Sequence, residues 1–213
     1  MNVIYSKFLK RLFDIIVSLL FLIITLPITL VVALLVRINL GSPVFFIQER
    51  TGYKEESFRL IKFRTMTDAR DENGELLPDR ERKTKFGNIL RKTSLDELPE
   101  MINVLKGDMA IIGPRPLKPA YLELYNEEQH KRHNVRPGFT CIAAVKGRNV
   151  LPWVERLELD TYYAENVSFF LDFKIAIQTV TVVLFGKGAP DASESSRESI
   201  YTALKREDNS ENK

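Results

Sequence analysis

The stretch IIVSLLFLIITLPITLVVALLV, residues 15–36, decides how this chain can be arranged. It carries no charge, and as a helix it would measure about 33 Å, enough for the roughly 30 Å hydrocarbon core of a bilayer. Pro27 lies in its middle, where it removes one backbone donor and crowds the carbonyl of Ile23. We therefore expect a membrane helix that bends or breaks at Pro27, with halves of about 18 and 14 Å that are each too short to cross.

Basic residues flank this stretch on both sides. Lys7, Lys10 and Arg11 precede it, and Arg37 and Arg50 are the first cations after it. Because loops rich in Lys and Arg stay cytoplasmic, two basic flanks favour a re-entrant helix-break-helix that enters and leaves on the same face. A kinked single-pass helix is the alternative, since transmembrane helices tolerate proline when nearby hydroxyls partner the freed backbone groups. No Ala-x-Ala-like site follows, which argues against a signal peptide.

The remaining chain has the size of one ordinary domain with a polar tail. We expect residues 1–37 to form the membrane anchor, 38–186 a cytoplasmic globular domain, and 187–213 a polar, disordered tail with a turn around 200–204. The expected fold class is α+β and helix-dominated. It comprises the re-entrant anchor and a small domain with a β-hairpin and interfacial amphipathic helices.

The net charge of +3 is unevenly distributed. Residues 1–36 carry +2 and residues 37–92 carry +4, so the half of the chain that adjoins the apolar stretch is basic. A basic surface at a membrane suits anionic headgroups or phosphorylated substrates. No nucleic-acid partner is expected, because the cations do not follow one helix and no nucleic-acid-binding motif is present.

The thiol and imidazole side chains do not indicate a reactive site. Cys141 is the only cysteine, so no disulfide can form within the chain, and we expect it to be a small buried residue. His130 and His133 lie three residues apart on an expected helix, but a metal site there would need a third ligand. We therefore expect no metal at the histidines.

Two runs with strand character, residues 44–50 and 58–64, predict a β-hairpin around Gly52. Alternation along the second run places Lys62 and Arg64 on the same side of the strand. Such cations often only protect a sheet edge from aggregation, whereas close to a membrane they also suit phosphate binding. The residues alone leave both interpretations open.

The segment SLDELP, residues 94–99, also has two interpretations. Ser94 followed by Glu97 is the pattern of a helix capping box. With Ser94 as the cap, however, Pro99 would lie too deep in the helix. A later start places Pro99 in the first turn and puts Asp96 and Glu97 at the helix entrance, where carboxylates or a phosphate are favoured. Local physical chemistry does not choose between a cap and a site.

The rest of the chain is assigned by periodicity and turn residues. In GPRP, residues 113–116, two prolines fix the backbone around Arg115, which suits a phosphate contact, although a Pro-rich turn with a solvated arginine explains the same residues. Residues 67–82 are expected as a mobile loop and 109–112 as a short buried strand, while helices are expected at 83–92, 100–105, 120–133, 153–164 and 168–185. The apolar residues of the last helix either join the core or lie in the headgroup plane.

These motifs together resemble those of the small monotopic phosphoglycosyl transferases of the bacterial sugar transferase family, of the kind that transfers bacillosaminyl or N-acetylhexosaminyl phosphate. The resemblance covers residues 5 to about 186. It is carried by KRLFD (10–14), KFRTM (62–66), SLDELP (94–99), NVLKGDM (103–109), IGPRP (112–116), VRPG (135–138) and GRN (147–149). No single motif is specific, but their ordered set is.

The resemblance implies transfer of a sugar 1-phosphate from a UDP-sugar to a polyprenyl phosphate such as undecaprenyl phosphate, with release of UMP. In the family the aspartate of an Asp-Glu pair carries the phosphosugar covalently, a role that matches Asp96 with Glu97 assisting, and Mg²⁺ is required, which these two carboxylates would hold. The residues implied at or near the substrate phosphates are Lys62, Arg64, Arg91, Arg115, Arg148 and Asp160. The implied place is the cytoplasmic face of the bacterial inner membrane, at the first membrane step of glycoconjugate assembly, with downstream glycosyltransferases as further partners.

The sequence also departs from the family pattern. The family often has Gly and Gln where this chain has Cys141 and Ala144, so the sugar is not predicted. The chain lacks the additional N-terminal membrane helices of larger relatives, and the resemblance implies the minimal form. Two other functions use similar residues: a membrane-bound Mg²⁺ hydrolase of lipid or nucleotide diphosphates, and a non-catalytic module that docks on anionic lipid.

Overall fold

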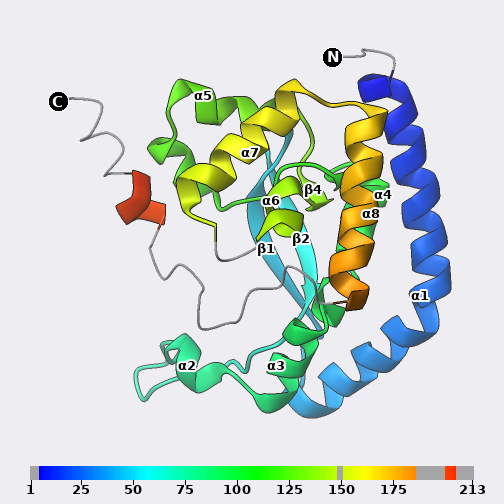
Figure 1. Cartoon of the computed structure of the whole chain (residues 1–213). Coiled ribbons are helices and arrows are strands. Elements are labelled where there is room, and N and C mark those ends of the chain that lie inside the picture. The colour runs from blue at the N-terminus through cyan, green and yellow to red at the C-terminus, as the bar shows by residue number, and fades with distance from the viewer. Residues whose placement is uncertain (1–4, 148–150, 186–199, 205–213) are drawn as a thin grey trace.

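The computed structural model describes residues 5–147, 151–185 and 200–204. Helices dominate the described chain, and two small two-stranded sheets lie among them (Figure 1). The expected helix-dominated α+β class is therefore confirmed, including the β-hairpin.

The apolar stretch forms one long helix. A π-helical turn, η1 (Tyr5–Leu9), leads into α1 (Lys10–Leu40), which remains helical through Pro27. Past its midpoint α1 turns beneath the rest of the molecule (Figure 1). The predicted bend is therefore present, but the predicted break is not. Proline removes only one donor from the ladder, and packing on both sides of it maintains the helix.

α1 packs against the domain along one side. The Phe21 ring lies 6.5 Å from that of Phe139, and Val32 and Val36 belong to a buried cluster with Phe63. The other side exposes apolar residues, among them Leu19, Ile23, Ile24, Leu30 and Leu34. By length and composition α1 could cross a membrane. The helix thus has one side packed on protein and one apolar side open to its surroundings.

The predicted hairpin consists of β1 (Phe45–Thr51) and β2 (Ser57–Phe63), joined through η2 (Tyr53–Glu55). The strands are antiparallel, with Phe45 opposite Phe63 and Thr51 opposite Ser57. Asn103 of α4 (Glu100–Lys106) attaches the hairpin to that helix. Its buried amide donates to the carbonyl of Arg59 (2.7 Å) and accepts from the backbone N–H of Ile61 (3.0 Å). Strand β2 and helix α4 are thereby held in fixed register.

A second sheet pairs β3 (Ala110–Ile112) with β4 (Gly138–Thr140) in parallel. The strands place Gly113 and Gly138 so close that a Cβ on Gly138 would lie 2.1 Å from the Gly113 nitrogen. Only residues without side chains permit this approach. The contact fixes the backbone that leads into the GPRP segment.

The remaining helices surround these sheets. They are α2 (Asp79–Arg82), α3 (Lys85–Lys92), η3 (Leu95–Glu97), η4 (Pro119–Leu124), α5 (Glu127–His130), η5 (Lys131–Asn134), α6 (Ile142–Lys146), α7 (Trp153–Glu165) and α8 (Phe169–Phe185). Residues 200–204 are also helical, and Ile200 and Leu204 pack on Leu157. The turn expected around 200–204 is confirmed, whereas the other residues of the predicted disordered tail lie outside the described part of the chain.

Asp172 of α8 joins the start of α1 to the domain. Its carboxylate accepts hydrogen bonds from the hydroxyls of Tyr5 and Tyr163 (both 2.6 Å) and from the ammonium of Lys10 (2.8 Å). All four side chains are largely buried. A network that spans more than 160 residues of sequence therefore positions η1 and α1 on α7 and α8.

Two helical predictions need correction. Residues 120–133 do not form one helix, because Asn126 caps α5 with a full capping box in which Gln129 returns the hydrogen bond, and this starts a new helix after η4. The choice for α8 between core and headgroup plane is also corrected, because Ile175 is buried in the core cluster with Tyr163 while Phe173, Ile177 and Val180 are 52–56% exposed. One side of α8 therefore joins the core, and the other exposes an apolar stripe.

Candidate active site

The acidic pair lies in a short 3₁₀ turn, η3, between α3 and α4. Ser94 has a left-handed backbone (φ 56°) and its side chain makes no capping hydrogen bond. The predicted capping box is therefore wrong, because Glu97 is directed toward β2. Pro99 is the N-cap of α4 and not a residue of its first turn, but Asp96 and Glu97 do lie just before the helix entrance, as the alternative interpretation expects.

Lys62 of β2 bridges two carboxylates. Its Nζ lies 2.8 Å from Oε1 of Glu97 and 2.8 Å from Oε1 of Glu100. Burial disfavours the charge of Lys62, but the two carboxylates outweigh that effect and raise its pKa. Burial raises the pKa of Glu100, although Lys62 opposes this shift. The ammonium therefore stays charged at the base of the site.

Asp96 is 8% exposed. Burial raises the pKa of its carboxyl, and the nearby Glu97 raises it further, while Lys62 and Arg91 act in the opposite direction. A carboxylate that has lost most of its water is a stronger nucleophile than one in bulk solvent. Asp96 is thus a poorly solvated carboxylate among cations, which is suited to attack at phosphorus.

Two predicted cations lie around the pair. Nη2 of Arg115 is 3.8 Å from Oε1 of Glu97, and its side chain is 61% exposed. Arg91, in the last turn of α3, is oriented by a hydrogen bond from Nε to Oγ1 of Thr65 (2.8 Å). A small pocket opens beside Arg115 and is lined by residues that include Arg50, Lys62, Glu97, Glu100, Arg115 and Phe139.

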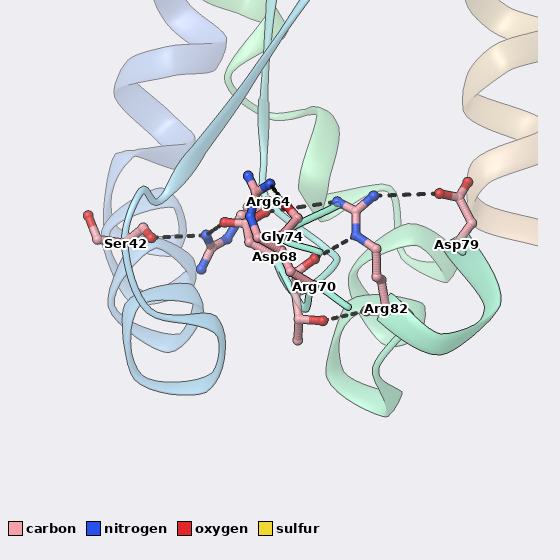
Figure 2. A network of polar contacts seen from close by, with 8 residues as sticks. Ser42, Arg64, Asp68, Arg70, Gly74, Asp79 and Arg82 are labelled. Atoms are coloured by element: carbon pink, nitrogen blue, oxygen red, sulfur yellow. Dashed lines mark hydrogen bonds and ion pairs between the residues drawn. The ribbon is translucent and has the colours of Figure 1, made fainter. Parts of the chain in front are cut away.

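Arg64 belongs to a different cluster. It follows the end of β2, and its Nη1 donates to Asp68 (2.6 Å) and to the carbonyl of Ser42 (3.0 Å), as Figure 2 shows. Nε of Arg82 donates to the carbonyl of Thr67 (2.9 Å), which joins the two ends of residues 67–82. These residues therefore form a hydrogen-bonded surface element. Arg64 is not among the residues that line the pocket, and its predicted contact with a substrate phosphate stays a prediction.

The other two predicted residues differ in position. Asp160 of α7 is buried at 4% exposure, and its Oδ2 lies 2.6 Å from Nη2 of Arg132. Arg148 lies outside the described residues. The structure thus brings together Lys62, Arg91, Asp96, Glu97 and Arg115, and places Asp160 behind them.

Two charged residues that line the pocket were not predicted, Glu100 and Arg50. Glu100 follows Glu97 by three residues, so helical spacing could have placed both on one side. Arg50 lies on β1, where strand alternation places it on the same side as Gln48, and its Nη2 donates to Gln48 (2.6 Å). The buried Nε of Arg50 has no hydrogen-bond partner among the described residues.

The donor set fits Mg²⁺. This ion usually takes one or two protein carboxylates and completes its shell with water and substrate phosphate. Asp96 and Glu97 supply carboxylates of that kind. Within the described ranges there is no group of three His, Cys, Asp or Glu residues that could form an all-protein metal site. His130 contacts Glu55 (2.6 Å), and His133 faces the carbonyl of Gly52.

Cys141 is buried, as predicted, at 4% exposure. Its Sγ accepts a hydrogen bond from the backbone N–H of Ala144 (3.3 Å). Burial raises the pKa of the thiol to about 11. It is therefore an unreactive, structural residue.

Comparison with known proteins identifies the family. The profile of bacterial sugar transferases matches residues 5–186. The uncharacterized sugar transferase EpsL of Bacillus subtilis (strain 168) is 52% identical over 180 residues, which cover 84% of this chain and 89% of that protein. The UDP-glucose:undecaprenyl-phosphate glucose-1-phosphate transferase of Klebsiella pneumoniae is 40% identical over 190 residues, 84% of this chain and 41% of that protein.

A further relative is the UDP-N-acetylgalactosamine-undecaprenyl-phosphate N-acetylgalactosaminephosphotransferase of Aeromonas hydrophila. It is 35% identical over 190 residues, which cover 85% of this chain and 45% of that protein. The profile spans nearly all of the described chain, including η3, β2 and the GPRP segment. The chain therefore belongs to the bacterial sugar transferase family, as an enzyme of the phosphoglycosyl transferase class.

Proposed function

We propose that this enzyme transfers a sugar 1-phosphate from a UDP-sugar to a polyprenyl phosphate, such as undecaprenyl phosphate, and releases UMP. The relatives from Klebsiella pneumoniae and Aeromonas hydrophila are named for reactions of this kind. The observation that carries the proposal is the buried Asp96 carboxylate next to the cluster of Lys62, Glu97, Glu100 and Arg115.

In the first half-reaction, a carboxylate oxygen of Asp96 attacks the phosphorus that carries the sugar. The bond between this phosphorus and the oxygen that bridges the two phosphates breaks, and UMP leaves with the bonding electrons. The product is an aspartyl phosphosugar. Lys62 and the exposed guanidinium of Arg115 lie where they can offset the negative charge of the diphosphate.

In the second half-reaction, an oxygen of the polyprenyl phosphate attacks the same phosphorus. The bond to Asp96 breaks, the carboxylate is regenerated, and a polyprenyl diphosphate sugar is released. Splitting the transfer into two displacements lets one nucleophile serve two substrates that differ greatly in solubility.

Asp96 and Glu97 are the residues that would hold Mg²⁺. A divalent ion there would neutralise diphosphate charge and stabilise the leaving UMP. The role of Glu97 follows from its contacts, because its ion pair with Lys62 fixes the turn that carries Asp96. The same ion pair leaves Asp96 without a direct lysine partner at 4 Å or less among the described residues.

The arrangement of α1 supports a re-entrant anchor, and we propose that the domain lies on the cytoplasmic face. Arg11, near the start of the helix, donates to the carbonyls of Val104 (2.7 Å) and Leu105 (2.8 Å), and Val36, near its end, is fully buried against the same domain. A helix that crossed a bilayer would have its ends on opposite faces, about 45 Å apart, where one small domain could not contact both. The exposed apolar side of α1 and the α8 stripe would then face lipid.

The test is a donor panel. Purified enzyme in detergent with Mg²⁺ and undecaprenyl phosphate receives UDP-glucose, UDP-galactose, UDP-N-acetylglucosamine or UDP-N-acetylgalactosamine. We expect UMP and a lipid-linked diphosphate sugar in equal amounts with at least one donor. Release of free sugar phosphate or inorganic phosphate without acceptor would instead indicate a hydrolase. No UMP with any donor would contradict the proposal.

A further inference from the structure

A buried ion pair between Arg132 and Asp160 lies on the interior side of Arg115 and binds its main chain. One terminal nitrogen of Arg132, Nη2, donates to the carbonyl of Arg115 (2.7 Å) and to Oδ2 of Asp160 (2.6 Å). Burial raises the pKa of the Asp160 carboxyl, and the backbone of Arg115 is among the groups that oppose this rise. The pair thus holds the carbonyl of the residue whose side chain faces Glu97.

This ion pair is enclosed by protein. The side chains of Arg132 and Asp160 are 1% and 5% exposed, and they come from η5 and α7, which are distant in sequence from the GPRP segment. The Arg115 side chain, by contrast, is 61% exposed. The main chain of Arg115 is therefore fixed from the interior while its guanidinium stays available at the pocket.

Stability alone does not account for this arrangement. Buried ion pairs contribute little net stability compared with apolar residues of the same volume, because both charges lose their water. The pair is also incompletely satisfied, since the buried Nε of Arg132 has no hydrogen-bond partner among the described residues. The pair does, however, fix the position of the Arg115 main chain.

We propose that Arg132 and Asp160 are positioning residues, which set the guanidinium of Arg115 for the substrate phosphate by holding its main chain. This inference rests on the proposed function and deepens it. It assigns Asp160 a role through Arg115 in place of a direct contact with phosphate. The Asp160 carboxylate is buried and already paired with Arg132, and an anion placed beside the substrate would repel the diphosphate.

The test is a double-mutant cycle. Arg132→Met with Asp160→Leu replaces the pair by apolar residues of similar volume, an exchange that proteins often tolerate. Asp160→Asn is a second, milder variant. Both are made in the wild-type chain and in the Arg115→Ala chain, and the rate of UMP release in a single turnover is followed over long times. The buried hydroxyl of Tyr163, removed by Tyr163→Phe, is the control, because it binds Asp172 and the carbonyl of Ile112 and not the main chain of Arg115.

In the chain that retains Arg115, we expect loss of the pair to lower the single-turnover rate by about ten-fold to a hundred-fold and to raise the KM for the UDP-sugar, the scale of a misplaced catalytic group. In the Arg115→Ala chain, the same changes should lower the rate by less than about two-fold, because no guanidinium remains to be positioned. Tyr163→Phe should change the rate by the same factor in both chains.

Other outcomes contradict the inference. Equal losses in both chains would show that Asp160 acts on the substrate directly or only on the fold, and an unchanged rate in the chain that retains Arg115 would show that the pair positions nothing. Asp160→Asn decides the question if the double variant does not fold. A wild-type enzyme that releases no UMP from any donor would instead refute the proposed function, so the two failures are distinguishable.

Discussion

The Nζ of Lys62 lies 2.8 Å from Oε1 of Glu97, although 35 residues separate them in sequence. This contact joins the end of the hairpin to the turn that carries Asp96. Because Glu100 binds the same ammonium, one cation connects β2, η3 and α4. The turn η3 is thus held by a charge cluster and not by its own short helix.

Lys62→Met should lower both stability and activity. Removing the cation leaves the buried Glu100 without its ion pair, which costs about 3 kcal/mol or more of unfolding free energy. Thermal unfolding in detergent and UMP release measure the two effects. Lys106→Met is the control, because Lys106 is 56% exposed in its ion pair with Asp108 and should cost less than about 1 kcal/mol. Equal stability of the two variants would contradict the role given to Lys62.

Gly138→Ala should be among the most disruptive single changes in the domain. The new Cβ would lie 2.1 Å from the backbone nitrogen of Gly113, where no flexible side chain can move away. We expect a loss of about 3 kcal/mol or more, read from chemical unfolding. In Gly74→Ala the new Cβ would meet no atom within 4 Å, and only the positive φ (+81°) disfavours the change. We therefore expect this variant to lose about 1–2 kcal/mol of unfolding free energy. A Gly138→Ala protein as stable as the Gly74→Ala protein would show that β3 and β4 do not approach this closely.

Acid should destabilise the fold through His133. Burial, and then the nearby Arg132, lower the pKa of this imidazole to about 4, while in the unfolded chain it is about 6.5. Between these values the unfolded state binds the proton more readily, so stability is complete above about pH 6.5 and is lost as the pH falls toward 4, by up to about 3 kcal/mol.

Unfolding of wild type and His133→Asn at pH 7.5 and pH 5 tests this expectation. The variant should lose less stability on acidification than the wild type. An acid response that His133→Asn does not alter would assign the effect to other groups.

The re-entrant anchor predicts that both ends of α1 face the cytoplasm. Cys141 is buried, so cysteines introduced one at a time by Asn2→Cys and Lys54→Cys can be labelled selectively with an impermeant maleimide. In intact spheroplasts neither should react, and after lysis both should. Labelling of Asn2→Cys alone before lysis would show that α1 crosses the membrane.

Local patterns predicted the elements well. The hairpin, the helices at 85–92 and 153–165, and the placement of the acidic pair before α4 follow from alternation, periodicity and the restriction that Pro99 imposes. Pro27 predicted a bend, but the continuity of α1 depends on packing against β2 and α4, which no local pattern contains.

The predictions that failed concern distant partners or weak signals. The left-handed backbone of Ser94 follows from the tie between Glu97 and Lys62 across the fold, which overrides the local capping pattern. The three-residue pairing of β3 with β4 is too short to show periodicity. The start of α5 at Asn126 was visible as a capping box within 120–133, but the apolar periodicity of that segment hid it.

The same distinction applies to the site. The cations and carboxylates were found from their motifs, but their grouping was not, because it depends on which side chains the fold turns toward one another. Arg64 and Asp160 illustrate this: one binds Asp68 on the surface and the other lies buried beneath Arg115. The sequence motifs identify the candidate residues, but only the tertiary contacts show which of them lie at the pocket.

The central claim is that Asp96 itself carries the sugar phosphate. Enzyme mixed with Mg²⁺ and a UDP-sugar that supports turnover, without acceptor, is quenched within one turnover and analysed by peptide mass spectrometry. We predict that the peptide containing Asp96 gains the mass of the sugar phosphate less one water, that undecaprenyl phosphate removes the gain, and that Asp96→Asn abolishes it. Product formation by an enzyme whose Asp96 peptide never changes mass would contradict the account.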